Sequence, residues 1–256
     1  SMLGFIKPTS GNAYVNGLES WENSSEIVKS VGYVPGEIAF PDLATGTEFL
    51  RCQAEFLGLK DMTYANELIK KLQLDPRANL KRMSKGMKQK TALVCALMNN
   101  SPILIFDEPT TGLDPLMRLA FMDIIKAEHK KGKTILMSSH MFNEMEDSCD
   151  KVALIDKGKI IDVADMNALR NRPQKDFKIE FHEKSDYEKF KQSGYTIIRD
   201  QEIYNQVTVT LPFDKINQLF FDLKNFNVKF ITEVKFSLEK YFKQILIEKK
   251  ENENAI

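Results

Sequence analysis

The sequence is poor in glycine and proline, with 12 and 9 residues among 256. This scarcity excludes collagen-like and low-complexity chains. Charge of one sign is not in excess either, because 36 Lys and Arg balance 36 Asp and Glu and leave a formal net charge of zero. No overall field therefore draws the chain to nucleic acid or to anionic lipid, and we expect no nucleic-acid partner.

Cysteines and long hydrophobic runs are also scarce. The three cysteines, Cys52, Cys95 and Cys149, are odd in number and lack metal-ligand spacing, which favours reduced thiols and a cytoplasmic location. The longest apolar stretches, such as residues 103–106, are strand-sized and far below the roughly 18 residues that cross a bilayer. The sequence therefore predicts no membrane span.

What is present is a regular alternation of helix and strand patterns. Apolar residues recur at helical spacing over residues 46–59, 63–74 and 88–99. The run Ile103-Leu104-Ile105-Phe106 is typical of a parallel strand buried on both faces. Beyond it, predicted helices and strands alternate at 116–131, 134–138, 142–149 and 151–155. This alternation predicts an α/β domain over residues 1–170.

The rhythm changes after Arg170-Asn171-Arg172-Pro173. Strand and helix patterns then follow in the order β-α-β-β-α-β, at residues 177–181, 185–192, 195–199, 204–211, 213–223 and 228–234. A closing helix is predicted from Leu238 to about residue 249. Because that order is the ferredoxin-like one, we predict a second, small α+β domain over residues 174–256.

Two adjacent carboxylates, Asp107 and Glu108, follow the strand at 103–106 directly. They are therefore expected at the carboxyl edge of the sheet, where ligands of open α/β sheets bind. One carboxylate there suits Mg²⁺, which prefers hard oxygen ligands, and the next suits an attacking water. The pair alone is equally compatible with solvation of a strand end or with capping of the next segment.

Further motifs surround this pair in a fixed order. The sequence resembles the ATP-binding cassette transporter family through its signature loop (Ser84-Lys85-Gly86-Met87-Lys88-Gln89), Walker B pair (Asp107-Glu108), D-loop (Gly112-Leu113-Asp114) and switch histidine (Ser138-Ser139-His140). The resemblance covers residues 2 to about 165. It implies a P-loop NTPase domain with a helical subdomain at about residues 40–100, followed by an accessory domain.

The resemblance also implies a function and its partners. The chain is expected to be the ATPase subunit of a transporter similar to bacterial multidrug, antibiotic or sodium exporters, with ATP and Mg²⁺ as cofactors. Its implied partners are a separate membrane permease and a second ATPase subunit, identical or different. Its implied location is cytoplasmic, peripheral on the inner face of the cell membrane.

Residue roles follow from the same resemblance. Glu108 would polarise the attacking water, Asp107 would hold magnesium, and His140 would touch the terminal phosphate. The residues implied in nucleotide binding are Ser84, Lys85, Gly86, Met87, Gln89 and Asp114, with Ser84 and Gly86 closing over ATP held by the partner cassette. Ser84 also has the position of a helix N-cap, and the two roles are compatible.

The sequence departs from the family at three places. Gly36 and Glu37 stand where the family has a glutamine, which makes Glu37 a candidate magnesium ligand, and Lys85 replaces a more common glycine. No G-x-x-x-x-G-K-[ST] phosphate loop occurs in the 256 residues. We therefore expect an incomplete P-loop domain, shortened at its N-terminus or begun at an internal methionine, with little activity alone. A non-hydrolysing regulatory module and a soluble cassette ATPase outside transport remain alternatives.

Overall fold

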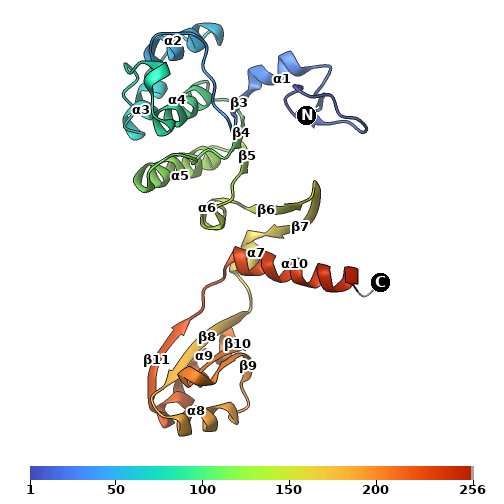
Figure 1. Cartoon of the computed structure of the whole chain (residues 1–256), viewed down its shortest axis with the longest axis vertical. Coiled ribbons are helices and arrows are strands. Elements are labelled where there is room, and N and C mark those ends of the chain that lie inside the picture. The colour runs from blue at the N-terminus through green and yellow to red at the C-terminus, as the bar shows by residue number, and fades with distance from the viewer. Residues whose placement is uncertain (255–256) are drawn as a thin grey trace. The chain divides into compact units, whose positions relative to one another are not determined.

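The computed structural model describes residues 1–254 and divides into two compact units, Ser1–Ser148 and a second unit that begins at Cys149 (Figure 1). The sequence places this boundary later, at residues 170–174. The difference arises because the hairpin of β6 (Lys151–Asp156) and β7 (Lys159–Asp165) is tied to the closing helix, where the Tyr241 hydroxyl donates to Asp162 at 3.1 Å. Among the helices of residues 1–254, none is long and apolar enough to cross a membrane.

The first unit is built on a parallel sheet in the order β3-β4-β5. Its strands are β3 (Val31–Val34), β4 (Ile103–Asp107) and β5 (Thr134–Ser138). Both faces of β4 are covered, as the sequence predicts. Leu104 and Phe106 lie in the main core, while Ile103 and Ile105 pack against a second apolar cluster.

Helices of the first unit connect and cover these strands. They are α1 (Ser24–Ser30), α2 (Gly46–Phe56), α3 (Thr63–Lys71), α4 (Lys85–Met98), α5 (Pro115–Lys130) and α6 (Phe142–Ser148). A short hairpin, β1 (Tyr14–Val15) and β2 (Leu18–Glu19), precedes them, and a 3₁₀ turn, η1 (Leu80–Arg82), precedes α4. Figure 1 shows α2 and α3 packed with α4, a helical group within the predicted range of about 40–100.

The helices α4 and α5 of the first unit each begin where a side chain caps them. The Ser84 hydroxyl accepts the Met87 amide, so α4 begins at Lys85, three residues before the predicted start. The Asp114 carboxylate accepts the Met117 amide, and α5 follows with Pro115 in its first turn. Such caps satisfy amides that the helix itself leaves unpaired. Both functional loops therefore end in fixed helix starts.

In the second unit, a four-stranded antiparallel sheet has the order β11-β8-β10-β9. After the β6–β7 hairpin its elements are α7 (Met166–Arg170), β8 (Gln174–Phe181), α8 (Lys184–Lys191), β9 (Thr196–Gln201), η2 (Glu202–Tyr204), β10 (Gln206–Pro212), η3 (Phe213–Lys215), α9 (Ile216–Asp222), η4 (Leu223–Asn225), β11 (Val228–Glu233) and α10 (Leu238–Asn254). The β-α-β-β-α-β order matches the sequence prediction, and the ferredoxin-like assignment stays a prediction.

This second unit has its own core. Alternate residues of β8 (Phe177, Ile179 and Phe181) and of β10 (Val207, Val209 and Leu211) point to one face of the sheet. Side chains of α8 (Tyr187 and Phe190) and α9 (Leu219) cover this face. The period of two along each strand is what places these apolar residues together.

Candidate functional site

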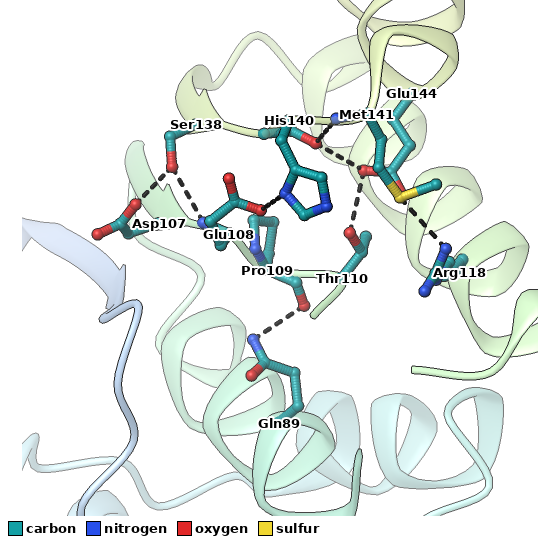
Figure 2. A network of polar contacts seen from close by, with 11 residues as sticks. Gln89, Asp107, Glu108, Pro109, Thr110, Arg118, Ser138, His140, Met141 and Glu144 are labelled. Carbon is teal, nitrogen blue, oxygen red and sulfur yellow. Dashed lines mark hydrogen bonds and ion pairs between the residues drawn. The ribbon is translucent and has the colours of Figure 1, made fainter. Parts of the chain in front are cut away.

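The carboxyl ends of β4 and β5 meet at Asp107 and Ser138, which are register partners in the sheet. The Ser138 hydroxyl donates to Asp107 Oδ1 at 2.5 Å and accepts the Glu108 amide at 3.0 Å (Figure 2). The apolar residues of both strands are held in the sheet, so the first polar residues after them gather at its edge. A single serine hydroxyl thereby orders both carboxylate residues.

Glu108 has a backbone conformation that side chains rarely adopt. Its φ of 48° lies in the left-handed region, which costs a non-glycine residue roughly 1–2 kcal/mol. The bond from its amide to Ser138 stabilises this conformation. In it, Glu108 Oε2 lies 2.7 Å from His140 Nδ1, and the His140 side chain is 74% exposed. Two residues 32 positions apart therefore present their polar ends together at an accessible surface.

The third strand, β3, contributes the surroundings of Asp107. A Cβ built on Gly36 would lie 2.9 Å from Asp107 Oδ2, so a side chain at position 36 would require the Asp107 carboxylate to shift. On β3 itself, burial and then the negative charge of Asp107 raise the pKa of Tyr33. Glu37 is exposed on the wall of a pocket of about 340 Å³ that Gly36, Ile38, Lys85, Lys88 and Gln89 also line.

The oxygen atoms around Asp107 fit a magnesium ion. Carboxylate and hydroxyl oxygens are the hard ligands that Mg²⁺ prefers, and Mg²⁺ usually takes one or two carboxylates and completes its shell with water and phosphate. Residues 1–254 contain no group of three or more His, Cys, Asp or Glu side chains placed to hold a metal. Asp107 and the Ser138 hydroxyl supply oxygen atoms of this kind at the sheet edge.

At the start of α4, the predicted signature residues take different positions. Ser84 and Lys85 are exposed, and the Ser84 hydroxyl serves as the helix cap. Gly86 lies against the carbonyl oxygen of Gly112, which a Cβ at position 86 would approach to 2.6 Å. Met87 is half-buried and packs against the main core. The exposed part of the signature turn is therefore its first two residues, and Gly86 and Met87 anchor it.

Gln89 and Asp114 have local partners in the described chain. The sequence groups Gln89 with the nucleotide-binding residues, but its side chain is only 3% exposed and donates to the Pro109 carbonyl at 2.9 Å. Gln89 therefore ties α4 to the loop after β4. Asp114 is exposed and caps α5 through the Met117 amide at 3.0 Å.

Sequence reasoning missed two members of this network and undervalued a third. Thr110 and Glu144 are buried and hydrogen-bonded to each other at 3.0 Å, and neither was a candidate site residue. Ser138 was noted only as part of the motif that precedes His140. The signal available for Glu144 was weak, because an acid in a short amphipathic helix is usually exposed.

Comparisons with known proteins show which proteins this chain is similar to. A family model described as ABC transporter matches residues 1–111. The bacitracin transport ATP-binding protein BcrA of Bacillus licheniformis is 28% identical, covering 96% of this chain and 82% of that protein. The linearmycin resistance ATP-binding protein LnrL of Bacillus subtilis is 31% identical over 66% of this chain, which spans 56% of its length.

A solved structure extends the likeness to three dimensions. An ATP-binding subunit of an ABC transporter superimposes with a TM-score of 0.60 at 28% identity, covering 67% of this chain and 73% of its own. The sheet and the helices around the β4 and β5 edge therefore belong to a known architecture.

Proposed function

We propose that this chain is an ATP-binding protein of the ABC transporter family and that it binds and hydrolyses ATP to power export through a separate membrane permease. The observation that carries the proposal is the paired geometry at the sheet edge. Asp107 is fixed by Ser138, and Glu108 contacts His140 at 2.7 Å. A carboxylate on a strained backbone at a strand end, in contact with an imidazole, is typical of a catalytic position.

The roles of these residues follow from their chemistry. The Glu108 carboxylate orients the attacking water and accepts a proton from it. General bases typically accelerate a reaction by about 10²- to 10⁴-fold. His140 fixes the Glu108 side chain from one side and presents its other ring nitrogen to the terminal phosphate. Asp107 would hold magnesium, with Glu37 as a second ligand from the loop after β3. The chemistry that magnesium would supply there is neutralisation of phosphate charge.

A second cassette subunit, identical or different, completes the proposed site. Ser84, Lys85 and the backbone amide of Gly86 stand at a helix start, a position that favours phosphate. Met87 anchors that turn, Gln89 positions it against Pro109, and Asp114 lies at the neighbouring helix start. These residues would close over ATP bound by the partner, while Asp107 and Glu108 would act on the chain's own nucleotide.

The place of action follows from the proposed partner. The subunit would lie in the cytoplasm, on the inner face of the membrane, where the permease receives it. The relatives named for bacitracin transport and linearmycin resistance favour an exporter of the antibiotic or multidrug class. The permease would select the cargo.

The test is Glu108→Gln in a form of this chain that also carries a phosphate loop, with Asp123→Asn, an exposed acid on α5, as the control. Glutamine keeps the shape of the side chain but cannot accept the proton, so phosphate release should fall by about 100-fold or more. ATP binding should persist. Asp107→Asn should instead weaken magnesium-dependent binding.

The outcome that rejects the proposal is equally defined. If Glu108→Gln leaves steady-state phosphate release within about twofold of wild type, the barrier has changed by only about 0.4 kcal/mol. Glu108 would then not be the base, and a non-hydrolysing role would replace the ATPase assignment.

A further inference from the structure

Glu144 is a buried acid whose contacts the proposed chemistry does not use. It lies on α6 with 8% of its surface exposed. Its Oε2 accepts two hydroxyl hydrogen bonds, from Thr110 at 3.0 Å and from Ser139 at 3.2 Å (Figure 2). Its Oε1 is buried and has no hydrogen-bond partner within the described residues.

The two hydroxyls belong to the two loops that carry the site. Thr110 lies two residues after Glu108, and Ser139 directly precedes His140. The Ser139 oxygen also accepts the Met141 amide at 3.0 Å, which fixes the chain on the far side of His140. One carboxylate oxygen therefore joins the loop after β4 to the loop after β5, beside the contact between Glu108 and His140.

A second tie joins the same two strand ends, through Ser138. That tie is exposed, whereas the bond to Glu144 from Thr110 is buried and the one from Ser139 is partly buried. Hydrogen bonds in a buried, low-dielectric setting are stronger than those that water can replace. The Glu144 tie is therefore the one that holds the spacing of the loops against solvent competition.

Stability alone is a poor explanation for this carboxylate. A buried acid pays a desolvation cost, and an oxygen left without a partner adds to it. An apolar side chain of similar size would avoid both costs but could not receive two hydroxyls. The arrangement favours a residue kept for geometry.

We propose that Glu144 is a positioning residue that sets the contact between Glu108 and His140 by holding Thr110 and Ser139 on one oxygen. This inference rests on the proposed ATPase function for its catalytic consequence, while the positional claim concerns contacts of the chain itself. Glu144 acts through His140 and does not touch the reacting atoms.

The first experiment measures position without activity. In the 256-residue chain, Glu144→Met removes the acceptor at similar length, Glu144→Gln keeps an acceptor oxygen, and Asp147→Asn is the control, an exposed acid on the same helix. We expect hydrogen exchange at the Met141 amide to accelerate at least tenfold in Glu144→Met only. The His140 ring signals should shift in the same variant.

The second experiment tests the catalytic consequence in the form of this chain that also carries a phosphate loop. Glu144→Met should lower kcat by about 10- to 100-fold, the effect of misplacing a catalytic group by about 1 Å. KM for ATP should stay within about twofold, because the positioning tie acts after binding. Glu144→Gln should restore most of kcat. In a His140→Ala background, Glu144→Met should cause no further loss, since non-additivity marks residues that act together.

Several results would overturn the inference. Unchanged Met141 exchange in Glu144→Met would remove the positional claim, and an additive loss with His140→Ala would show that Glu144 acts elsewhere. Should Glu144→Met not fold, Thr110→Val, which removes one hydroxyl at constant shape, takes its place with the same expectations. If Glu108→Gln does not affect hydrolysis, only the ATPase proposal is rejected. The positional claim for Glu144 is unaffected, because hydrogen exchange at the Met141 amide does not depend on hydrolysis.

Discussion

Gly86 and Gly112, 26 positions apart, pack backbone to backbone. A Cβ at position 86 would lie 2.6 Å from the Gly112 carbonyl oxygen, and one at Gly112 would lie 3.5 Å from the Gly86 amide nitrogen. Gly112 also has a φ of 84°, in the left-handed region that favours glycine. The signature turn and the loop before α5 are thus locked together within one chain.

Gly86→Ala should destabilise the first unit by about 1–3 kcal/mol, because the atom it meets is backbone and cannot rotate away. Gly58→Ala is the control, since its φ is 69° but nothing lies within 4 Å of the added carbon. It reports the cost of the left-handed backbone alone, about 1 kcal/mol. A denaturant midpoint for Gly86→Ala no lower than that of Gly58→Ala contradicts the contact.

Ser84 has a structural role that can be separated from a nucleotide role. Ser84→Ala should cost about 1 kcal/mol by removing the cap of α4, whereas Ser84→Asn should keep the cap and the stability. If the Ser84 hydroxyl also contacts ATP, Ser84→Asn should lower ATP turnover at unchanged melting temperature in the form of this chain that also carries a phosphate loop. Full activity of Ser84→Asn would assign Ser84 to capping alone.

Glu128 forms a buried charge cluster that joins α5 to α3. It is 1% exposed, accepts from Tyr64 at 2.7 Å and Lys131 at 2.6 Å, and pairs with the buried Lys133. Glu128→Leu leaves Lys133 without its partner and should cost about 3–5 kcal/mol in urea unfolding, while adding Lys133→Met should recover most of the loss. A double variant no more stable than Glu128→Leu would refute this account.

The same cluster predicts an acid dependence. Burial alone raises the pKa of Glu128, but hydrogen bonds from Lys131, Lys133 and Tyr64 outweigh it and hold the pKa below its ordinary value. Its stabilisation is therefore present above the unfolded pKa of about 4.3 and is lost as pH falls through the folded value. The double variant Glu128→Leu with Lys133→Met should lose stability less steeply in acid than wild type.

The thiols should differ sharply in reactivity. Burial raises the pKa of Cys95 to about 12, while Cys52 is exposed. At pH 8, iodoacetamide should label Cys52 and spare Cys95 in the folded protein, as peptide mass spectrometry would show, and guanidinium should abolish the difference. The contribution of Cys95 to stability is intact below its unfolded pKa of about 8.5 and is lost as pH rises toward 12.

The second unit should fold alone when it includes the β6–β7 hairpin. Residues 149–256 contain their own core and the bond between Tyr241 and Asp162. Residues 174–256 lack the hairpin that α10 contacts, so we expect the same sheet with reduced protection of α10 in hydrogen exchange. Equal protection of α10 in both fragments would show that the boundary near residue 170, predicted from sequence, is the better one.

Much of this architecture is local and was readable in the sequence. The run at 103–106 predicted a strand because a short continuous apolar run is typical of a strand covered on both faces, and the two carboxylates that follow it were expected at the edge of the sheet. The caps at Ser84 and Asp114 involve residues three positions apart. The family motifs also predicted that Glu108 and His140 belong to the same site. The catalytic roles of the two residues stay predictions.

Tertiary packing alone decided the rest. Thr110 meets Glu144 across 34 residues, Gln89 meets Pro109 across 20, and α10 bonds β7 across 79. No periodicity encodes such pairs, because hydrophobic spacing fixes which face of an element is buried but not which polar group will lie opposite. Those partners follow from how α4, α6 and the sheet edge pack in three dimensions, where most buried polar atoms find a donor or acceptor.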